Sequence, residues 1–352
     1  MNKKKIKYTL IALLAFIAFL IISNFTMNQY QLRILNLCAI YIILGLSLNL
    51  VNGFTGLFVL GHAGFMAVGA YTTALLTMTP ADKVSNFFMK PVIAPLATIQ
   101  LPFPIALLLA GLMAALAGFI IGAPALKLKD DYLAIATLGF AEIIRVVFTN
   151  TQSITNGALG LTKLPVYTNI WWTWGLALLT IVFMVRLVNS SYGSALKAIR
   201  DDDIAAEAMG IGLFKHKVIS FIIGAFLAGV GGGLLGNLLG TVDPNMFRFM
   251  LTFQILLIVV LGGTGSITGT VISAIIVTVS MEYLRVLDQD INLGFTIVPG
   301  ISGMRMVVFS ALLLVVILFY QQGLMGKREF SWDSISKIKR KLDKLRKRGV
   351  KA

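Results

Sequence analysis

Long apolar runs recur along this chain, and short polar stretches separate them. A hydrocarbon core about 30 Å thick needs about 20 apolar residues in a helix. Ten stretches come near this length, although the two at 132–149 and 248–262 are short. They centre on residues 8–23, 34–52, 57–78, 102–124, 132–149, 170–188, 217–240, 248–262, 265–284 and 303–321. The pattern predicts an all-α polytopic membrane protein with about ten transmembrane helices.

Composition supports this fold class. Of the 352 residues, 57% are hydrophobic and 13% are charged, and the mean hydropathy is +0.87. A soluble domain carries about 25% charged residues, so composition argues against a set of soluble domains. The first apolar run follows four lysines but lacks a convincing signal-peptide cleavage site. We therefore expect it to be retained as the first span.

One polar segment, Ser191–Lys217, lies between two apolar runs and carries Asp201, Asp202, Asp203 and Glu207. A charge at the centre of a bilayer costs about 2.5–3.5 kcal/mol on insertion scales, so this segment is predicted to lie outside the hydrocarbon. It is nevertheless rich in residues that favour helices. We predict a helical segment rather than a flexible linker.

The same segment shows helix boundaries and an apolar stripe. The cluster Asp201–Asp203 is suited to cap or begin a short helix, and Gly210 and Gly212 provide a stop. The stripe consists of Ile204, Ala208 and Ile211. Such a helix fits a groove on a partner protein or lies on lipid. Three successive aspartates oppose contact with anionic lipid, which favours the partner.

Basic residues gather on one side of the predicted spans. Eleven of the 30 lie between Lys327 and Lys351, and four precede the first span. Cytoplasmic loops are enriched in Lys and Arg, so we predict that both termini and the segment 191–217 are cytoplasmic. The chain then divides into a transmembrane domain at 1–326 and a basic cytoplasmic tail at 327–352. Topology explains the net charge of +15 better than nucleic-acid binding does.

Two predicted spans carry a small residue at every fourth position. These ladders are Ala106, Ala110, Ala114, Gly118, Gly122 and Gly224, Ala228, Gly232, Gly236, Gly240. In lipid, small faces allow helix backbones to approach closely. Packing within the chain is the favoured interpretation, and an interface with a partner subunit or the translocation path is the alternative.

Several residues within the spans are candidates for a translocation path. The stretch "NGFTGLFVLGHAGFMAVGAY" is dense in glycine, which frees backbone groups that protein or a water-filled cavity must satisfy. Its His62 is more typical of a packed or capping group than of a metal ligand. Glu142 and Arg145 are three positions apart and share a helix face. They either form a structural ion pair or line the path of a solute. Gly61, His62, Glu142 and Asn156 are the path candidates.

The sequence offers no catalytic set. No G-x-x-x-x-G-K-[ST] motif occurs, and "GGTGSITG" lacks the surrounding βαβ unit of a nucleotide site. The single cysteine, Cys38, excludes an internal disulfide and a multi-cysteine metal site. We expect a chain that is not an enzyme and that binds no cofactor or metal itself.

Residues Ala205, Ala206 and Gly210 match the "EAA…G" core of the cytoplasmic loop of ABC importer permeases. The loop "ALKAIRDDDIAAEAMGI" resembles more closely the permeases of branched-chain amino acid importers. So do "LSLNLVNGFTGLFVLGHAGFMAVGAY", "DYLAIATLGFAEIIRVV", "TNGALGLTKLP", "VVLGGTGSITGTVISA" and "MRMVVFSALLLVVILFYQQGLMG". These blocks cover most of residues 35–326. Ile204 departs from the first Glu of the general motif.

The resemblance implies a permease subunit of an ATP-driven importer in a bacterial plasma (inner) membrane. Its partners would be a second homologous permease chain, two cytoplasmic ATPase subunits that use ATP, and an extracellular or periplasmic solute-binding protein. Residues 195–211 would form a coupling helix that the ATPases move. The expected ATPase contacts are Arg200, Asp202, Ala205, Ala206, Glu207 and Gly210.

The resemblance implies branched-chain amino acids (Leu, Ile, Val) as the solute. Related permeases that handle urea or other amides leave that substrate class open. A stand-alone secondary carrier or channel would also keep an intramembrane ion pair and glycine-broken helices. It would not need the long cytoplasmic segment.

Overall fold

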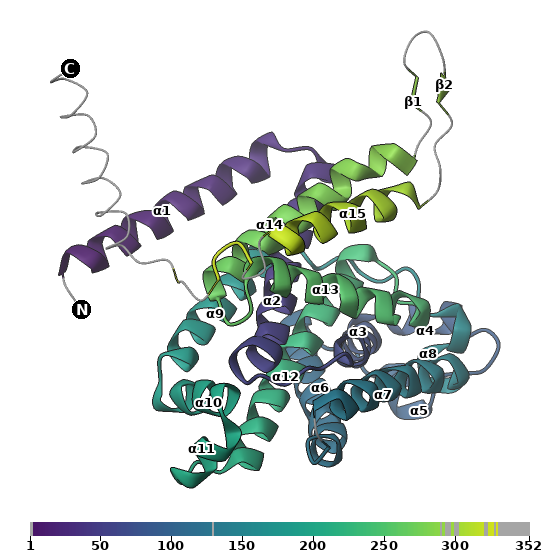
Figure 1. Cartoon of the computed structure of the whole chain (residues 1–352). Helices are drawn as coiled ribbons and strands as arrows, with labels where there is room; N and C mark the ends of the chain where they lie inside the picture. Colours follow the sequence, from purple (N-terminus) through teal and green to yellow (C-terminus); the bar gives the residue numbers. More distant parts are fainter. Residues whose placement is uncertain are drawn as a thin grey trace, which may run out of the picture. The chain divides into compact units, whose positions relative to one another are not determined.

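The computed structural model describes residues 3–128, 130–288, 291–292, 297–298, 303–319, 323–326 and 329. Within these residues, each of the predicted apolar stretches contains a helix (Figure 1). These helices are α1 (Lys3–Thr26), α2 (Gln29–Asn49), α3 (His62–Thr77), α6 (Phe103–Ala125), α7 (Asp130–Asn150), α9 (Ile170–Val188), α12 (Leu213–Leu239), α13 (Phe249–Gly262), α14 (Ile267–Tyr283) and α15 (Met304–Phe319). The helical fold class is confirmed. Residues 33–327 form one compact unit, and α1 belongs to a second.

Shorter elements connect these helices. They are the π-helix η1 (Leu50–Phe54), helices α4 (Pro80–Asn86), α5 (Ala94–Thr98), α8 (Gln152–Thr155), α10 (Ser191–Asp201) and α11 (Asp203–Ala208), and the 3₁₀ turns η2 (Gly157–Leu159), η3 (Pro244–Phe247) and η4 (Leu284–Asp288). The short strands β1 (Ile291–Asn292) and β2 (Ile297–Val298) pair antiparallel. Apart from Glu329, the tail predicted at 327–352 lies outside the described residues.

Five of the described helical segments are long and apolar enough to cross a membrane. They are 29–54, 103–125, 132–150, 170–188 and 213–239. The apolar helices at 13–26, 249–262 and 267–283 are shorter. A helix of 14 residues such as α13 is about 21 Å long, less than the hydrocarbon thickness. The chain is a multi-pass membrane protein, while ten spans and the orientation of the ends stay predictions.

The glycine-rich helix α12 packs against α3 and α6 in the core of residues 33–327. A methyl group added at Gly69 of α3 would collide with the backbone of Gly229, and one at Gly232 would collide with the carbonyl of Met66. The ladder on α6 contacts α12 in the same way, with Gly118 against Ala225. Packing within the chain, the favoured interpretation of the two ladders, is therefore confirmed.

Helix α2 ends in η1 and is followed by a non-helical stretch before α3 begins at His62. The predicted span at 57–78 therefore starts five residues later. The backbone N–H of Leu60 donates to Thr137 Oγ1 at 3.1 Å, and that of Val59 donates to Asn52 Oδ1 at 3.3 Å. Protein side chains thus satisfy the backbone groups that the glycine-rich stretch frees, as buried non-helical backbone requires.

The connection between α3 and α6 carries α4 and α5, which Lys83 holds together. Its side chain is buried, and Nζ donates to the carbonyls of Leu96 at 2.7 Å and Ile99 at 2.5 Å. Burial lowers the pKa of Lys83. The same connection exposes the large apolar side chains of Val84 and Phe88. It therefore combines an internally satisfied polar centre with an apolar surface.

Candidate functional site

The predicted segment 191–217 comprises α10, α11 and the first residues of α12. Its part between α9 and α12, residues 191–212, forms a compact projection that we call the handle (Figure 1). It contains two helices, α10 and α11, so the coupling helix expected at 195–211 is divided in two. The break is at Asp202, whose backbone is extended with φ −163°. Its Oδ1 accepts a hydrogen bond from Ala205 N–H at 2.9 Å and caps α11. The expected acidic cap is thus confirmed.

The end of α11 is fixed by Gly210. The N–H of Ile211 donates to the carbonyl of Ala206 at 3.1 Å, and Gly210 N–H donates to the carbonyl of Glu207 at 2.9 Å. These two bonds form a Schellman motif, which needs a left-handed residue, and Gly210 has φ +84°. The predicted stop at Gly210 is confirmed, and Gly212 begins α12 as its N-cap.

We expect Gly210→Ala to loosen the handle, because a side chain in the left-handed region costs about 1 kcal/mol. Backbone amides at 209–211 should then exchange hydrogen about fivefold faster. Gly212→Ala is the matched control, since Gly212 has φ −70° and open space at its Cβ position. Hydrogen exchange read by mass spectrometry measures both variants. Equal exchange in the two would contradict the role of Gly210.

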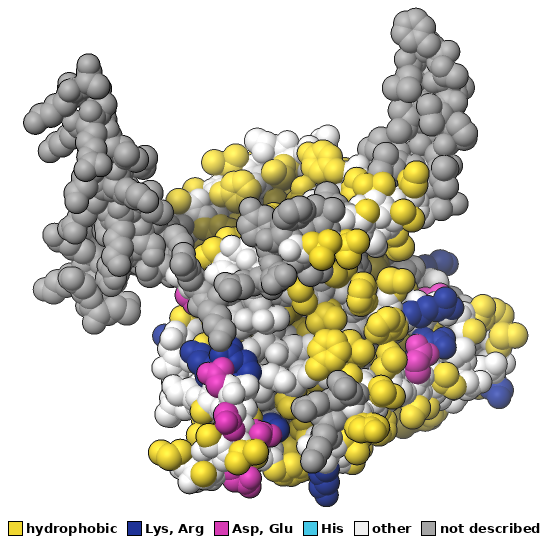
Figure 2. Space-filling view, viewed as in Figure 1, with side chains coloured by type: hydrophobic (Ala, Val, Ile, Leu, Met, Phe, Trp, Pro, Cys, Tyr) yellow, Lys and Arg dark blue, Asp and Glu magenta, His cyan; other side chains and the backbone are white. Residues whose placement is uncertain are grey.

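The handle exposes apolar side chains beside acidic ones. Ile204 is 78% exposed and Met209 is 83% exposed. Figure 2 shows apolar and acidic side chains together at the corner where α10 and α11 lie in Figure 1. Ala205 and Glu207 are also exposed. Large apolar side chains exposed together mark an interaction surface.

Ala206 differs from its neighbours, because it is buried with only 4% of its surface exposed. The expectation of a direct ATPase contact at Ala206 therefore does not fit this conformation. α11 lies against both α10 and α12. Ala206 packs within the handle, where only a small side chain lets α11 lie close to its neighbours.

The handle is attached firmly to α12. Tyr192 Oη donates to the carbonyl of His216 at 2.9 Å, and the two rings stack at 5.2 Å between centroids. Burial raises the pKa of Tyr192 to about 12, so the phenol stays protonated as a donor. Lys217 Nζ lies 3.8 Å from the Asp203 carboxylate. A force on α11 therefore reaches α12 through several contacts.

Arg200 connects the handle to η1. Its Nη1 donates to the carbonyl of Gly53 at 3.1 Å, while Nε and Nη2 donate to Asp201 Oδ1. A methyl group at Gly56 would meet the Arg200 side chain, and one at Gly265 would meet its guanidinium. One side of the guanidinium thus faces two glycine turns and the other bonds the exposed Asp201, with 21% of the Arg200 side chain exposed. The ATPase contact expected for Arg200 stays a prediction.

Asn49 is a functional candidate that sequence reasoning missed. Its Nδ2 donates to Ser266 O at 2.9 Å and Thr270 Oγ1 at 2.8 Å, and its Oδ1 accepts from Gly265 N–H at 2.9 Å. The side chain is fully buried at the end of α2. Together with Arg200, it joins α2, η1, the turn before α14 and the handle. The available signal was an amide inside an apolar span, which Asn49 shares with Asn36 and Asn52.

Three of the four path candidates have structural contacts. His62 is buried, and its Nε2 lies 2.8 Å from Ser47 Oγ, so it is a packed group as favoured. Gly61 lies against the backbone of Thr137, where a methyl group would collide. Asn156 adopts φ 61° and donates from Nδ2 to Gly160 O at 2.8 Å in a turn beyond the far end of α7. The role of these residues in a translocation path stays a prediction.

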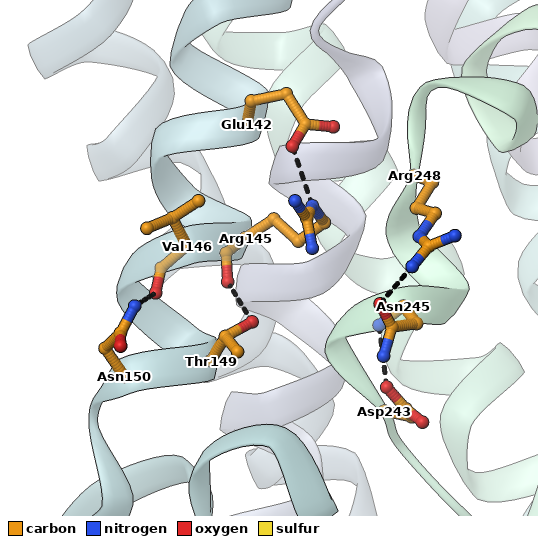
Figure 3. A network of polar contacts seen from close by, with 8 residues as sticks. All are labelled: Glu142, Arg145, Val146, Thr149, Asn150, Asp243, Asn245 and Arg248. Atoms are coloured by element: carbon orange, nitrogen blue, oxygen red, sulfur yellow. Dashed lines mark hydrogen bonds and ion pairs between the residues drawn. The ribbon is translucent and has the colours of Figure 1, made fainter.

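Glu142 and Arg145 form the predicted ion pair on α7, with Arg145 Nε 2.7 Å from Glu142 Oε2 (Figure 3). Neither side chain is fully buried, with 42% of Glu142 and 24% of Arg145 exposed. Arg248, in the neighbouring turn, donates to Asn245 Oδ1 at 2.7 Å. The ion pair is confirmed, and lining of a solute path by Glu142 stays a prediction.

Metal binding has no support in the described part of the chain. No group of three or more His, Cys, Asp or Glu side chains is placed there to hold an ion. What the structure places together is an exposed helix pair and a set of contacts that join it to the helical core.

Comparison with known proteins decides the family. The profile of the family described as branched-chain amino acid transport system / permease component matches residues 30–318. The chain belongs to this family. This branched-chain permease is 36% identical over 307 residues to the high-affinity branched-chain amino acid transport system permease protein LivM of Escherichia coli K12, covering 78% of this chain and 68% of that protein.

Two further relatives extend the comparison. The probable branched-chain amino acid transport permease protein LivM of Methanocaldococcus jannaschii is 26% identical over 322 residues, covering 82% of this permease and 91% of that protein. The high-affinity branched-chain amino acid transport system permease protein LivH of E. coli K12 is 32% identical over 164 residues, covering 46% of this permease and 47% of that protein. No solved structure matches this permease significantly. The resemblance stated from the sequence motifs is confirmed.

Proposed function

We propose that this chain is the membrane-spanning permease subunit of an ATP-driven importer of branched-chain amino acids in a bacterial plasma (inner) membrane. Membership of the permease family and the similarity to LivM support the transported class. The similarity to LivH supports pairing with a second, homologous permease chain. A solute-binding protein outside the membrane delivers the amino acid, and two ATPase subunits inside use ATP. We expect this chain itself to bind neither ATP nor a cofactor, because its sequence has no G-x-x-x-x-G-K-[ST] motif.

The observation that carries the proposal is the displayed apolar surface of the handle. Ile204 and Met209 are large and apolar, and most of their surface is exposed. An apolar helix face of this kind fits a groove on a partner protein. The exposed residues Asp202, Ala205 and Glu207, with the turn at Gly210, complete the surface that meets an ATPase.

Movement of the bound ATPases would reach the spans by two routes. One runs through Tyr192 and Lys217 into α12, and the other runs through Arg200 into η1 and the end of α2. Arg200 and Ala206 are positioning residues in this scheme. Glu142 is retained as a residue that would meet the solute on its way through the membrane.

Ile204→Asp and Met209→Asp are expected to reduce co-purification of the ATPase subunits at least about tenfold. Each variant places a charge where the bound ATPase would bury an apolar side chain. The tagged chain is purified in mild detergent from its native host, and all co-eluting proteins are identified. Val166→Asp is the control, since Val166 is 67% exposed on a different loop. Elution of the wild-type chain alone, with transport intact after reconstitution, would favour a stand-alone carrier.

A further inference from the structure

Two neighbouring cavities lie among α2, α12, α13 and α14, and both are lined by Leu37 and Tyr41. Their volumes are about 180 Å³ and about 420 Å³. Small-molecule pockets span roughly 300–1,000 Å³, so the two together suit a small solute. Glu142 and the other three path candidates line neither cavity.

An ion pair bridges the cavities. Glu282 lines the smaller cavity, Arg285 lines the larger one, and Arg285 Nη1 lies 3.1 Å from Glu282 Oε1. Only 20% of the Glu282 side chain is exposed. Arg33 adds a second guanidinium to the larger cavity. Charged groups near apolar spans are costly and mark solute pathways by default.

Neutral polar groups converge on the smaller cavity from three helices. Tyr41 of α2, Gln254 of α13 and Thr278 of α14 all line it. Thr278 is 7% exposed, and its side chain lies beside the Cys38 thiol. The phenol of Tyr41 and the amide of Gln254 can each form a hydrogen bond with a ligand in this cavity.

Apolar side chains form the remaining walls. The smaller cavity is lined by Ile258 and Val277, and the larger by Leu235, Leu239 and Leu251. The lining thus combines one acidic group, two basic groups, neutral hydrogen-bonding groups and aliphatic surface. These are the complements of an ammonium group, a carboxylate and an aliphatic side chain.

We infer that the joined cavities are a binding site for a zwitterionic amino acid with an apolar side chain, which rests on the proposed function. The ammonium group meets Glu282, the carboxylate meets Arg285 and Arg33, and the side chain contacts the leucine-lined wall. Glu282, Arg285 and Arg33 give the lining a net charge of +1, which an inserted zwitterion does not change. Each charged group of the ligand then meets an opposite charge, which avoids the large cost of an isolated buried ion.

The position of the cavities agrees with import. With ten spans and both termini cytoplasmic, as the sequence predicts, Arg33 and Arg285 lie at the outer ends of their spans. An importer receives its solute from that side. Tyr41, Gln254 and Thr278 lie deeper along the same spans, so a solute passing the arginines would meet groups that can hydrogen-bond it.

The test uses the complete complex in lipid nanodiscs, titrated with leucine and observed by saturation-transfer NMR. Leucine binding to Glu282→Gln should weaken about tenfold or more, as expected when a hydrogen bond to a charged group is lost. The same variant should also lose most of its preference for leucine over 4-methyl-2-oxopentanoate, which lacks the ammonium group. Leu37→Trp, which fills the junction of the cavities, should abolish binding.

Arg248→Gln is the matched control, because it removes a charge at the same predicted side but lines neither cavity. Leucine uptake with the binding protein is measured in parallel. Normal uptake and binding in both cavity variants would overturn the site and leave the proposed function standing. Loss of the second permease from Leu37→Trp would identify a subunit interface instead. A wild-type complex that takes up no apolar amino acid would refute the proposed function together with the ligand.

Discussion

Gly69→Leu is expected to prevent assembly of the folded permease. Gly69 of α3 touches the backbone of Gly229 in α12, so any side chain must push the two helices apart. Backbone cannot yield as the end of a flexible side chain can, and overpacking at such a contact costs about 3 kcal/mol or more. That is a large part of the 5–15 kcal/mol by which a protein is stable. Fluorescence-detected size exclusion in detergent measures the loss of monodisperse protein.

Gly175→Leu is the control for this change, because nothing lies within 4 Å of a Cβ atom at Gly175 of α9. The same residue type is replaced by the same side chain in a different helix, at an open site. This variant should elute like the wild type. A normal elution profile for Gly69→Leu would mean that α3 and α12 do not approach as closely as described.

Arg200→Gln is expected to uncouple transport from ATP hydrolysis. The guanidinium links the handle to the carbonyl of Gly53, and only 21% of the Arg200 side chain is exposed. The ATPase subunits should therefore still co-purify and hydrolyse ATP. Leucine uptake should fall at least about tenfold, because the variant loses the charged hydrogen-bond donor through which movement of the handle would reach η1. Uptake and ATP hydrolysis are compared in proteoliposomes.

Lys197→Gln serves as the control on the same helix, since Lys197 Nζ bonds only locally to the carbonyl of Val188 at 3.1 Å. It should leave the ratio of uptake to ATP hydrolysis unchanged. Loss of the ATPase subunits from Arg200→Gln would restore the contact role that the sequence alone suggested for Arg200.

Local chemistry was predictable from the sequence. The acidic cap at Asp202, the stop at Gly210 and the small-residue contacts on α6 and α12 each depend on neighbouring residues or on one periodic face. The same holds for the Glu142–Arg145 pair, whose members are three positions apart. Propensity, capping and helical spacing act over one or two turns, so a single sequence contains them.

Contacts between distant segments were not predictable. Arg200 and Gly53 are 147 positions apart, and Asn49 reaches partners more than 210 positions away. A periodic face shows that a helix packs against something, but the segment it meets depends on packing of the whole unit. One sequence carries no signal for that partner. The cavities are the clearest case, because Tyr41, Gln254 and Thr278 come from three helices and no spacing in the sequence relates them to one another.

The lone thiol of this permease makes its topology measurable. Cys38 is the single cysteine and is only 4% exposed, so a thiol reagent added from solution has no accessible target. A cysteine placed at Ile204 or at Tyr283, each 78% exposed, would therefore carry any label alone. A membrane-impermeant maleimide applied to intact cells would mark the extracellular position and spare the cytoplasmic one. Because the native cysteine does not react, labelling of an introduced cysteine reports on which side of the membrane it lies.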